Sequence, residues 1–185
     1  MVSELLKLNR SYRRFHQKTV DTEFLRECIE SARCSASGAN RQRLRFVIVN
    51  DQQTSGRIFD CLKFAAFLKD WGGPLPGERP TAYIIVMTAS PLDTVAAIDM
   101  GIAAQSILLT AIEKGVGGCI FRSYDREALA DILSREGYYP ELVIALGYPS
   151  EKAVIVEPIK GDLKYYRDEN DIHCVPKLSV DELII

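Results

Sequence analysis

The segment from Asn9 to Phe15 gathers three arginines and a serine within seven residues. Arg10 and Arg13 lie three residues apart, so on a helical turn they share one face, and Ser11 can add a hydroxyl donor. Arginine presents planar, paired donors that match phosphate oxygens, and each charge-assisted hydrogen bond contributes roughly 1.5–3 kcal/mol. The segment predicts an anion site, although a solvated basic turn has the same composition.

Two further segments offer backbone donors with little side-chain bulk. Residues 35–42 read Ser-Ala-Ser-Gly-Ala-Asn-Arg-Gln, and Gly117-Gly118 is expected to open a second such loop after a long apolar helix. A ligand with a phosphate tail and a flat heteroaromatic ring would use all three segments, because the tail needs arginines and the ring needs backbone groups and amides. Asn9, Asn40 and Gln42 are the candidate amides, although loop asparagines also close turns.

Helices and short strands alternate around these segments. Apolar residues at helical spacing predict helices over residues 3–8, from Asp21 or Thr22 to about 34, and over about 54–69, 99–114 and 125–133. Short β-branched runs predict strands over 46–50, 83–88 and 142–147. Residues 71–77 are expected to form a mobile loop whose Trp71 is either a lid or an anchor, and the tail 168–177 is expected to be irregular. This layout predicts one α+β domain over residues 1–185.

The overall composition excludes several classes of partner. The formal net charge is -2 over 185 residues, and the sequence pI is about 5.8, so neither general nucleic-acid binding nor a polybasic membrane anchor is expected. The first residues mix Glu4 and Lys7 with apolar side chains, unlike a signal peptide, and no uninterrupted apolar run approaches the ~20 residues of a membrane span. We therefore expect a cytoplasmic protein.

The cysteines and histidines give no sign of a catalytic or metal centre. The five cysteines are odd in number and form no Cys-x-x-Cys, so we expect buried free thiols. His16 and His173 have no second ligand at metal spacing, and no Gly-x-Ser-x-Gly elbow supports a hydrolytic triad. No metal site and no catalytic side chain are predicted.

Four motifs in order carry a family resemblance. They are Arg-Ser-x-Arg-x-Phe at 10–15, Ala-Ser-Gly-x-Asn-x-Gln at 36–42, Asp-x-Gly-x-Ala-x-Gln at 99–105, and Leu-Gly-Tyr-Pro at 146–149. Together they resemble the nitroreductase family of FMN-dependent oxidoreductases over essentially the whole chain. The resemblance implies a three-layer α+β fold, with a central, mostly antiparallel sheet flanked by helices, and an interlocked homodimer with FMN at the interface.

The resemblance also assigns cofactor-binding residues. Arg10, Ser11 and Arg13 would hold the ribityl phosphate and the flavin edge, and Lys177 would meet the phosphate. Ala36, Ser37, Gly38 and Asn40 would come from the partner chain and cover the ring. The turn formed by Ile120, Phe121, Arg122 and Ser123 would run past the pyrimidine and N5. Where similar proteins often continue Asn-x-Gln with Pro-Trp, this chain has Arg43 and Leu44, which makes the acceptor the least predictable part of the site.

The implied activity is two-electron reduction of nitroaromatics, quinones or related small electrophiles, with NADH or NADPH as donor. Because the flavin ring carries the hydride, the protein needs no acid–base residue of its own. Two alternatives share the fold. One is a flavin-binding protein without efficient turnover, and the other is an oxygen-dependent or dehalogenating flavoenzyme.

Overall fold

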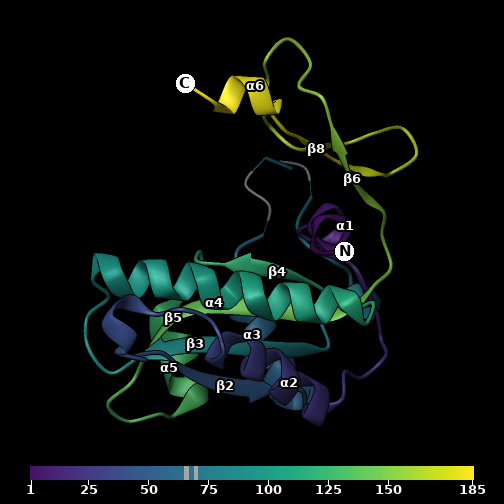
Figure 1. Ribbon diagram of the computed structural model, residues 1–185. Coiled ribbons are helices and arrows are strands. Elements are labelled where there is room, and N and C mark those ends of the chain that lie inside the picture. Colours follow the sequence, from purple (N-terminus) through teal and green to yellow (C-terminus); the bar gives the residue numbers. More distant parts are fainter. Residues whose placement is uncertain (65–66, 69–70) are drawn as a thin grey trace.

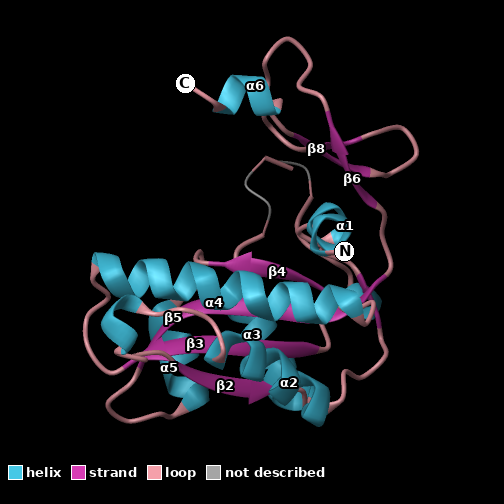
Figure 2. Cartoon of the chain, in the orientation of Figure 1, coloured by secondary structure: helices cyan, strands magenta, loops and turns pink. Residues whose placement is uncertain are grey.

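The computed structural model describes residues 1–64, 67–68 and 71–185. Short helices and strands alternate along the chain, with one long helix in the middle (Figures 1 and 2). The helices are α1 Val2–Leu8, α2 Thr22–Arg33, α3 Gln52–Cys61, α4 Thr94–Glu113, α5 Arg126–Leu133 and α6 Val180–Leu183, with 3-10 turns η1 Gly38–Asn40 and η2 Pro76–Glu78. The strands are β1 Phe15–His16, β2 Arg45–Val49, β3 Ala82–Thr88, β4 Gly117–Phe121, β5 Tyr139–Pro149, β6 Ala153–Val156, β7 Tyr166–Arg167 and β8 His173–Pro176.

The central sheet is antiparallel and has β5 as its hub. β3 lies between β2 and β5, and β4 and β1 also pair with β5. All seven residues of β3 are buried, because helices cover both faces of the sheet. Alternate β3 residues supply the two cores: Ile84 packs with α2 and α4, and Ile85 packs with α3 and α5. The predicted three-layer α+β fold is confirmed.

Aspartate caps set the beginnings of four helices. Asp21, Asp51, Asp93 and Asp125 each accept hydrogen bonds from backbone N–H groups in the first turn of the helix that follows. The central helix α4 therefore begins at Thr94, five residues before the predicted start at Asp99. It ends where predicted, because Gly115 follows it with φ +74°, a conformation that favours glycine.

Helix α3 is shorter than its apolar pattern predicted. It ends at Cys61, and Leu62 adopts extended dihedrals and bridges to Tyr124. The N–H of Lys63 then donates to the carbonyl of Ser123, and the N–H of Asp125 donates to the carbonyl of Cys61. These long-range backbone bonds replace the next helical turn, so the predicted helix is wrong at residues 62–64 and 67–68. Its remaining predicted residues, Ala65, Ala66 and Lys69, lie outside the described residues.

Two segments expected to be irregular are strands. Gly117 and Gly118 begin β4 rather than a loop, yet the expected close approach is present, since a Cβ on Gly118 would lie 2.8 Å from the carbonyl oxygen of Ala145. The tail also contains a small sheet, in which β8 pairs parallel with β6 and antiparallel with β7. This small sheet and α6 extend away from the central sheet, and α1 lies between them and β4 (Figure 1).

The Trp71 ring packs against one aromatic ring and two guanidinium groups. The Trp71 ring meets Phe64 edge-on at 6.1 Å, and the guanidinium groups of Arg14 and Arg167 lie over it at 5.8 and 5.5 Å. Those contacts favour the anchor over the lid.

All five cysteines are free, as expected, but Cys34 is exposed while the other four are buried.

Helix α4 is long and apolar enough, by length and composition alone, to cross a membrane. Core helices pass the same test. Met100, Ala104 and Ile107 of α4 pack onto the central sheet, as expected for a core helix.

Candidate functional site

The arginine-rich segment runs in extended form between α1 and β1. Asn9 closes α1 by donating its N–H to the carbonyl of Leu5, and Ser11 forms a parallel bridge with Gly118 of β4. The N–H of Tyr12 donates to the carbonyl of Gly118 at 3.0 Å. The expectation that Arg10 and Arg13 share a helical face is therefore wrong. Pairing with β4 fixes this segment instead.

This segment forms one wall of a cavity of about 280 Å³. The floor comes from α4 and β4, and the far wall comes from the C-terminal segment. The lining residues are Asn9, Arg10, Ser11, Arg13, Gln105, Leu108, Gly118, Ile120, Tyr165, His173, Val175 and Lys177. The cavity therefore brings together five of the predicted cofactor-binding residues, which come from widely separated parts of the chain. We call it the anion cavity.

The charges of the anion cavity all have one sign. Arg10, Arg13 and Lys177 line it, and among the described residues no aspartate or glutamate does. Among the salt bridges of the described residues, none involves these three cations. Cations gathered without carboxylate partners repel one another, and a bound anion relieves that repulsion.

Arg10 is the clearest case of a cation prepared for a ligand. Its Nη2 donates to the carbonyl of Leu6 at 2.7 Å, which fixes the guanidinium, while its buried Nε has no partner. Burial lowers the pKa of Arg10 below its ordinary value, because a half-buried guanidinium has lost part of its hydration. A phosphate would restore both the missing acceptor and the missing counter-charge.

The other lining groups suit the remainder of a cofactor such as FMN. Asn9 and Gln105 are amides that both donate and accept hydrogen bonds, while Leu108 and Ile120 are apolar. Mixed apolar and polar lining of this kind is typical of small-molecule sites. The residues present fit the phosphate end of FMN.

The remaining predicted residues on the loop after α2 lie elsewhere in the protomer. Ala36 and Ser37 line a separate groove of about 550 Å³ between α2, β2 and α4. Gly38 docks on α4, since its N–H donates to Oδ1 of Asp99 at 2.8 Å. Asn40 is exposed. Their contribution to a flavin site through a partner chain remains a prediction.

The backbone of this loop is strained. Ala39, Asn40 and Gln42 have φ between 49° and 51°, in the left-handed region that non-glycine residues rarely adopt. Such residues cost of order 1–3 kcal/mol each and gather at ligand-binding segments. The strain is consistent with a loop that is shaped for contact.

The segment 120–123 is only partly as predicted. Ile120 and Phe121 are the last residues of β4, not part of a turn. Ile120 lines the anion cavity. The side chain of Phe121 instead packs in the core on the opposite face of the sheet, where its ring centroid lies 4.9 Å from that of Phe64. Arg122 and Ser123 are exposed and line none of the anion cavity. Strand alternation thus separates Ile120 from Phe121.

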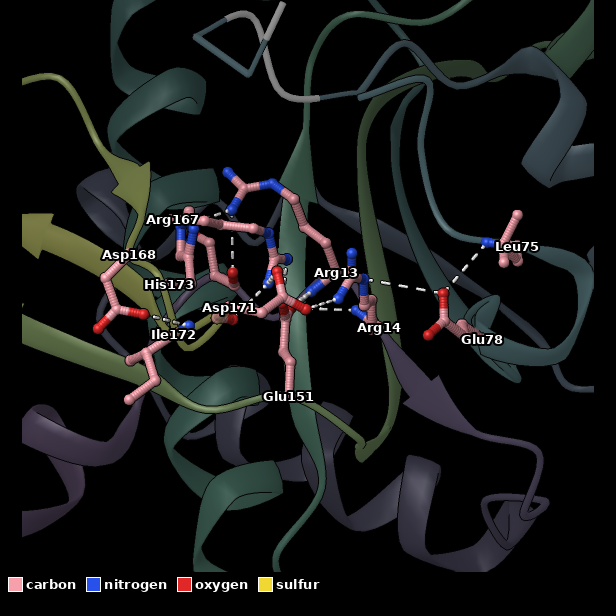
Figure 3. Close-up of polar contacts among 11 residues, drawn as sticks. Arg13, Arg14, Leu75, Glu78, Glu151, Arg167, Asp168, Asp171, Ile172 and His173 are labelled. Carbon is pink, nitrogen blue, oxygen red and sulfur yellow. Dashed lines mark hydrogen bonds and ion pairs between the residues drawn. The ribbon is translucent and has the colours of Figure 1, made fainter. Parts of the chain in front are cut away.

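Several lining residues were missed from the sequence, and Tyr165 and His173 are the two of them that contact Arg13. Tyr165 and His173 lie in the C-terminal segment, where the guanidinium of Arg13 sits 4.8 Å from the ring centroid of Tyr165 and 3.0 Å from Nε2 of His173. The short apolar run after His173 was the available signal for a strand, four residues before Lys177. Figure 3 shows His173 beside Arg13, with Glu151 between Arg13, Arg14 and Arg167.

His173 should make stability fall in acid. Burial, and then the neighbouring Arg13, lower its pKa to about 4; Glu151 opposes this and Arg167 adds to it. Between pH 6.5 and 4 the unfolded chain binds a proton at His173 while the folded chain does not, so stability decreases as pH falls through that window. We expect the free energy of unfolding to drop on the order of 1 kcal/mol from pH 7 to 5 on this account. Urea unfolding of wild type and His173→Gln at both pH values measures it, and equal losses in the two proteins would rule out His173 as the source.

Comparisons with known proteins identify the family of this chain. The family model described as the nitroreductase family matches residues 9–148. The chain belongs to the nitroreductase family. A relative from Methanothermobacter thermautotrophicus, with the provisional name NADH dehydrogenase/NAD(P)H nitroreductase, is 29% identical over 158 residues, covering 81% of this chain and 78% of its own.

Solved structures of nitroreductase-family proteins share the fold. One from Streptococcus pneumoniae TIGR4 aligns with a TM-score of 0.70 at 20% identity, over 100% of this chain and 99% of its own. An FMN-dependent nitroreductase from Clostridium difficile R20291 aligns with a TM-score of 0.66 at 23% identity, over 80% and 87%. At these identities the likeness establishes the fold, and the function of this chain must be inferred from its own residues.

Proposed function

We propose that this nitroreductase-family protein is an FMN-dependent oxidoreductase that uses NADH or NADPH for two-electron reduction of nitroaromatics, quinones or related small electrophiles. The observation that carries the proposal is the anion cavity, which Arg10, Arg13 and Lys177 line together and which no carboxylate of the described part of the chain lines. Family membership supports the oxidoreductase class. A cytoplasmic location, expected from the composition, is part of the same proposal.

The chain's own residues would bind and orient rather than react. Arg10, Ser11, Arg13 and Lys177 would hold the phosphate, and Leu108 and Ile120 would exclude water from one side of the cavity. When bound, FMN would supply the hydride-transfer chemistry. This division explains why no residue is assigned a catalytic proton transfer.

We further propose that the site is completed in an interlocked homodimer. Helix α4 presents Val95, Ile98 and Ile102 to solvent at 40, 58 and 39% exposure, spaced along one face. The loop with Ala36, Ser37, Gly38 and Asn40 contacts the same end of α4, since Gly38 bonds to Asp99 and approaches Val95. Burial of this face against a second copy would bring that loop to the partner's cavity. The C-terminal arm, formed by β6, β7, β8 and α6, ends in exposed Leu183 and Ile184. An exposed apolar end of this kind fits an interlocked arrangement.

Ile98→Asp tests the dimer. A carboxylate on this apolar face would have to be desolvated at the interface, so the variant should be monomeric at micromolar concentration and should retain less FMN. Light scattering coupled to size exclusion, with flavin absorbance, measures both. Asp131→Ala, an exposed change on α5, should behave as wild type. A dimeric Ile98→Asp variant would contradict the assignment of this face.

The activity itself is tested with the purified protein. We expect FMN to bind and raise the melting temperature, and NADH or NADPH to bleach the bound flavin anaerobically. Reoxidation should then be timed with a panel of quinones, nitroaromatics and enones. A protein that stays colourless with added FMN overturns the proposal. Stoichiometric FMN that neither dinucleotide reduces would select the flavin-binding alternative, and fast reoxidation by air that consumes the flavin would select oxygen-dependent chemistry.

A further inference from the structure

The Arg13 side chain is oriented by partners that carry no charge. It is 8% exposed. Its Nη1 donates to the carbonyl of Ser11 at 3.1 Å and to Nε2 of His173 at 3.0 Å, and its guanidinium lies over the ring of Tyr165. No carboxylate in the described chain forms a salt bridge with this guanidinium. Neutral groups therefore fix its direction, and among the described residues it forms no ion pair that would neutralise it.

His173 must be a neutral acceptor in this arrangement. An arginine has only donors, so Nε2 accepts the hydrogen bond and carries no proton. The imidazole is 1% exposed, its ring lies 5.2 Å from that of Tyr165, and the burial that lowers its pKa to about 4 keeps it neutral at pH 7. A carboxylate at this position would orient Arg13 equally well but would cancel its charge. A neutral imidazole orients Arg13 without cancelling its positive charge.

The backbones on both sides of this contact are fixed independently. On one side, Oε1 of Glu151 accepts the N–H groups of Arg13 and Arg14. On the other, the N–H of His173 donates to the carbonyl of Lys152 at 2.9 Å, and β8 pairs with β6 and β7. Neither anchor uses the imidazole, so the imidazole is free to act on the Arg13 side chain.

We infer that His173 is a positioning residue that aims Arg13 at the phosphate of the cofactor and so sets the preference for FMN over riboflavin. This inference rests on the proposed function, because it specifies how the same cavity recognises its anion. His173 lines the cavity but is only 1% exposed, so it would act through Arg13 rather than by binding the phosphate itself. Its effect should appear only with ligands that carry the phosphate.

Three substitutions at one position test the inference. His173→Leu removes the acceptor, His173→Gln can place an amide oxygen near the position of Nε2, and His173→Asn places its amide near Nδ1, which has no partner in the structure. Dissociation constants for FMN and riboflavin, by titration calorimetry of the flavin-free protein, are the readout. We expect FMN binding to weaken roughly tenfold in the Leu and Asn variants, with riboflavin changed less than about twofold, and Gln to restore FMN binding.

The outcomes separate this inference from the proposed function. Wild type that binds neither flavin overturns both. Wild type that binds FMN, with a Leu variant that keeps wild-type FMN affinity or loses FMN and riboflavin equally, overturns only the role of His173. If the Leu variant fails to fold, the Gln and Asn variants decide, because equal FMN affinities in that pair would contradict an acceptor at Nε2.

Discussion

Replacing Arg10 with alanine should weaken FMN binding by roughly two orders of magnitude, the effect of losing one or two charge-assisted hydrogen bonds. Arg10 is fixed by its bond to the carbonyl of Leu6, has an unsatisfied Nε, and has already lost hydration. Little of the binding energy is therefore needed to order or desolvate it. Riboflavin, which lacks the phosphate, should bind the variant nearly as well as it binds wild type.

Arg57→Ala provides the matched control for Arg10. Arg57 is exposed on α3, and α3 packs on the face of the sheet opposite to α4. Both changes remove one positive charge, so long-range attraction of an anion changes similarly. If the two variants lose FMN affinity equally, the loss comes from the long-range electrostatic field of the protein rather than from direct contact. The assignment of Arg10 to phosphate binding is then wrong. Calorimetry at two salt concentrations also separates these cases, because screening acts mainly on the long-range part.

The sequence predicted the fold where local chemistry decides the structure. β3 reads as a continuous β-branched and aromatic run because both its faces are buried. Asp21 before α2 and Gly115 after α4 mark helix ends through capping and left-handed geometry that any sequence context shares. Such features depend on a few neighbouring residues and can be read without knowing the rest of the chain.

The errors occurred where distant segments compete with local propensity. The apolar stripe of α3 continues past Cys61, yet the backbone of residues 61–63 pairs with residues 123–125 instead. The tail forms strands because β8 pairs with β6 and β7, and its apolar run of three residues was too short to predict that pairing. Pairing of this kind is decided by tertiary context rather than by propensity.

The residues of the site also separate into those that the sequence predicted and those that it did not. Arg10, Ser11 and Arg13 were predicted from residue types that suit phosphate, and Lys177 was predicted from the family resemblance. The structure brings all four into one cavity. Tyr165 and His173 were not predictable, because each contacts Arg13 across more than 150 residues of chain. A residue that orients another has no motif of its own.

Glu151→Ala should destabilise the protein by about 3–5 kcal/mol, because it removes the carboxylate that joins Arg167 of β7 to the backbone of Arg13 and Arg14, just before β1. The side chain of Glu151 is 2% exposed. One oxygen accepts the N–H groups of Arg13 and Arg14, and the other accepts Nη2 of Arg167. Without it, two backbone donors lose their acceptor, and among the described residues Arg167 keeps only the exposed Asp171 as a charged partner (Figure 3).

The size of this effect distinguishes a buried junction from an ordinary surface contact. Glu157→Ala removes an exposed carboxylate just after β6 and should change stability by less than about 0.5 kcal/mol. Glu151→Gln keeps one acceptor for the backbone but removes the charge facing Arg167, so it should fall between the two. Urea unfolding at one fixed protein concentration compares all three. A loss below about 1 kcal/mol in Glu151→Ala would mean that the arm is held mainly by β-pairing and apolar contacts, with Glu151 contributing no more than a surface ion pair does.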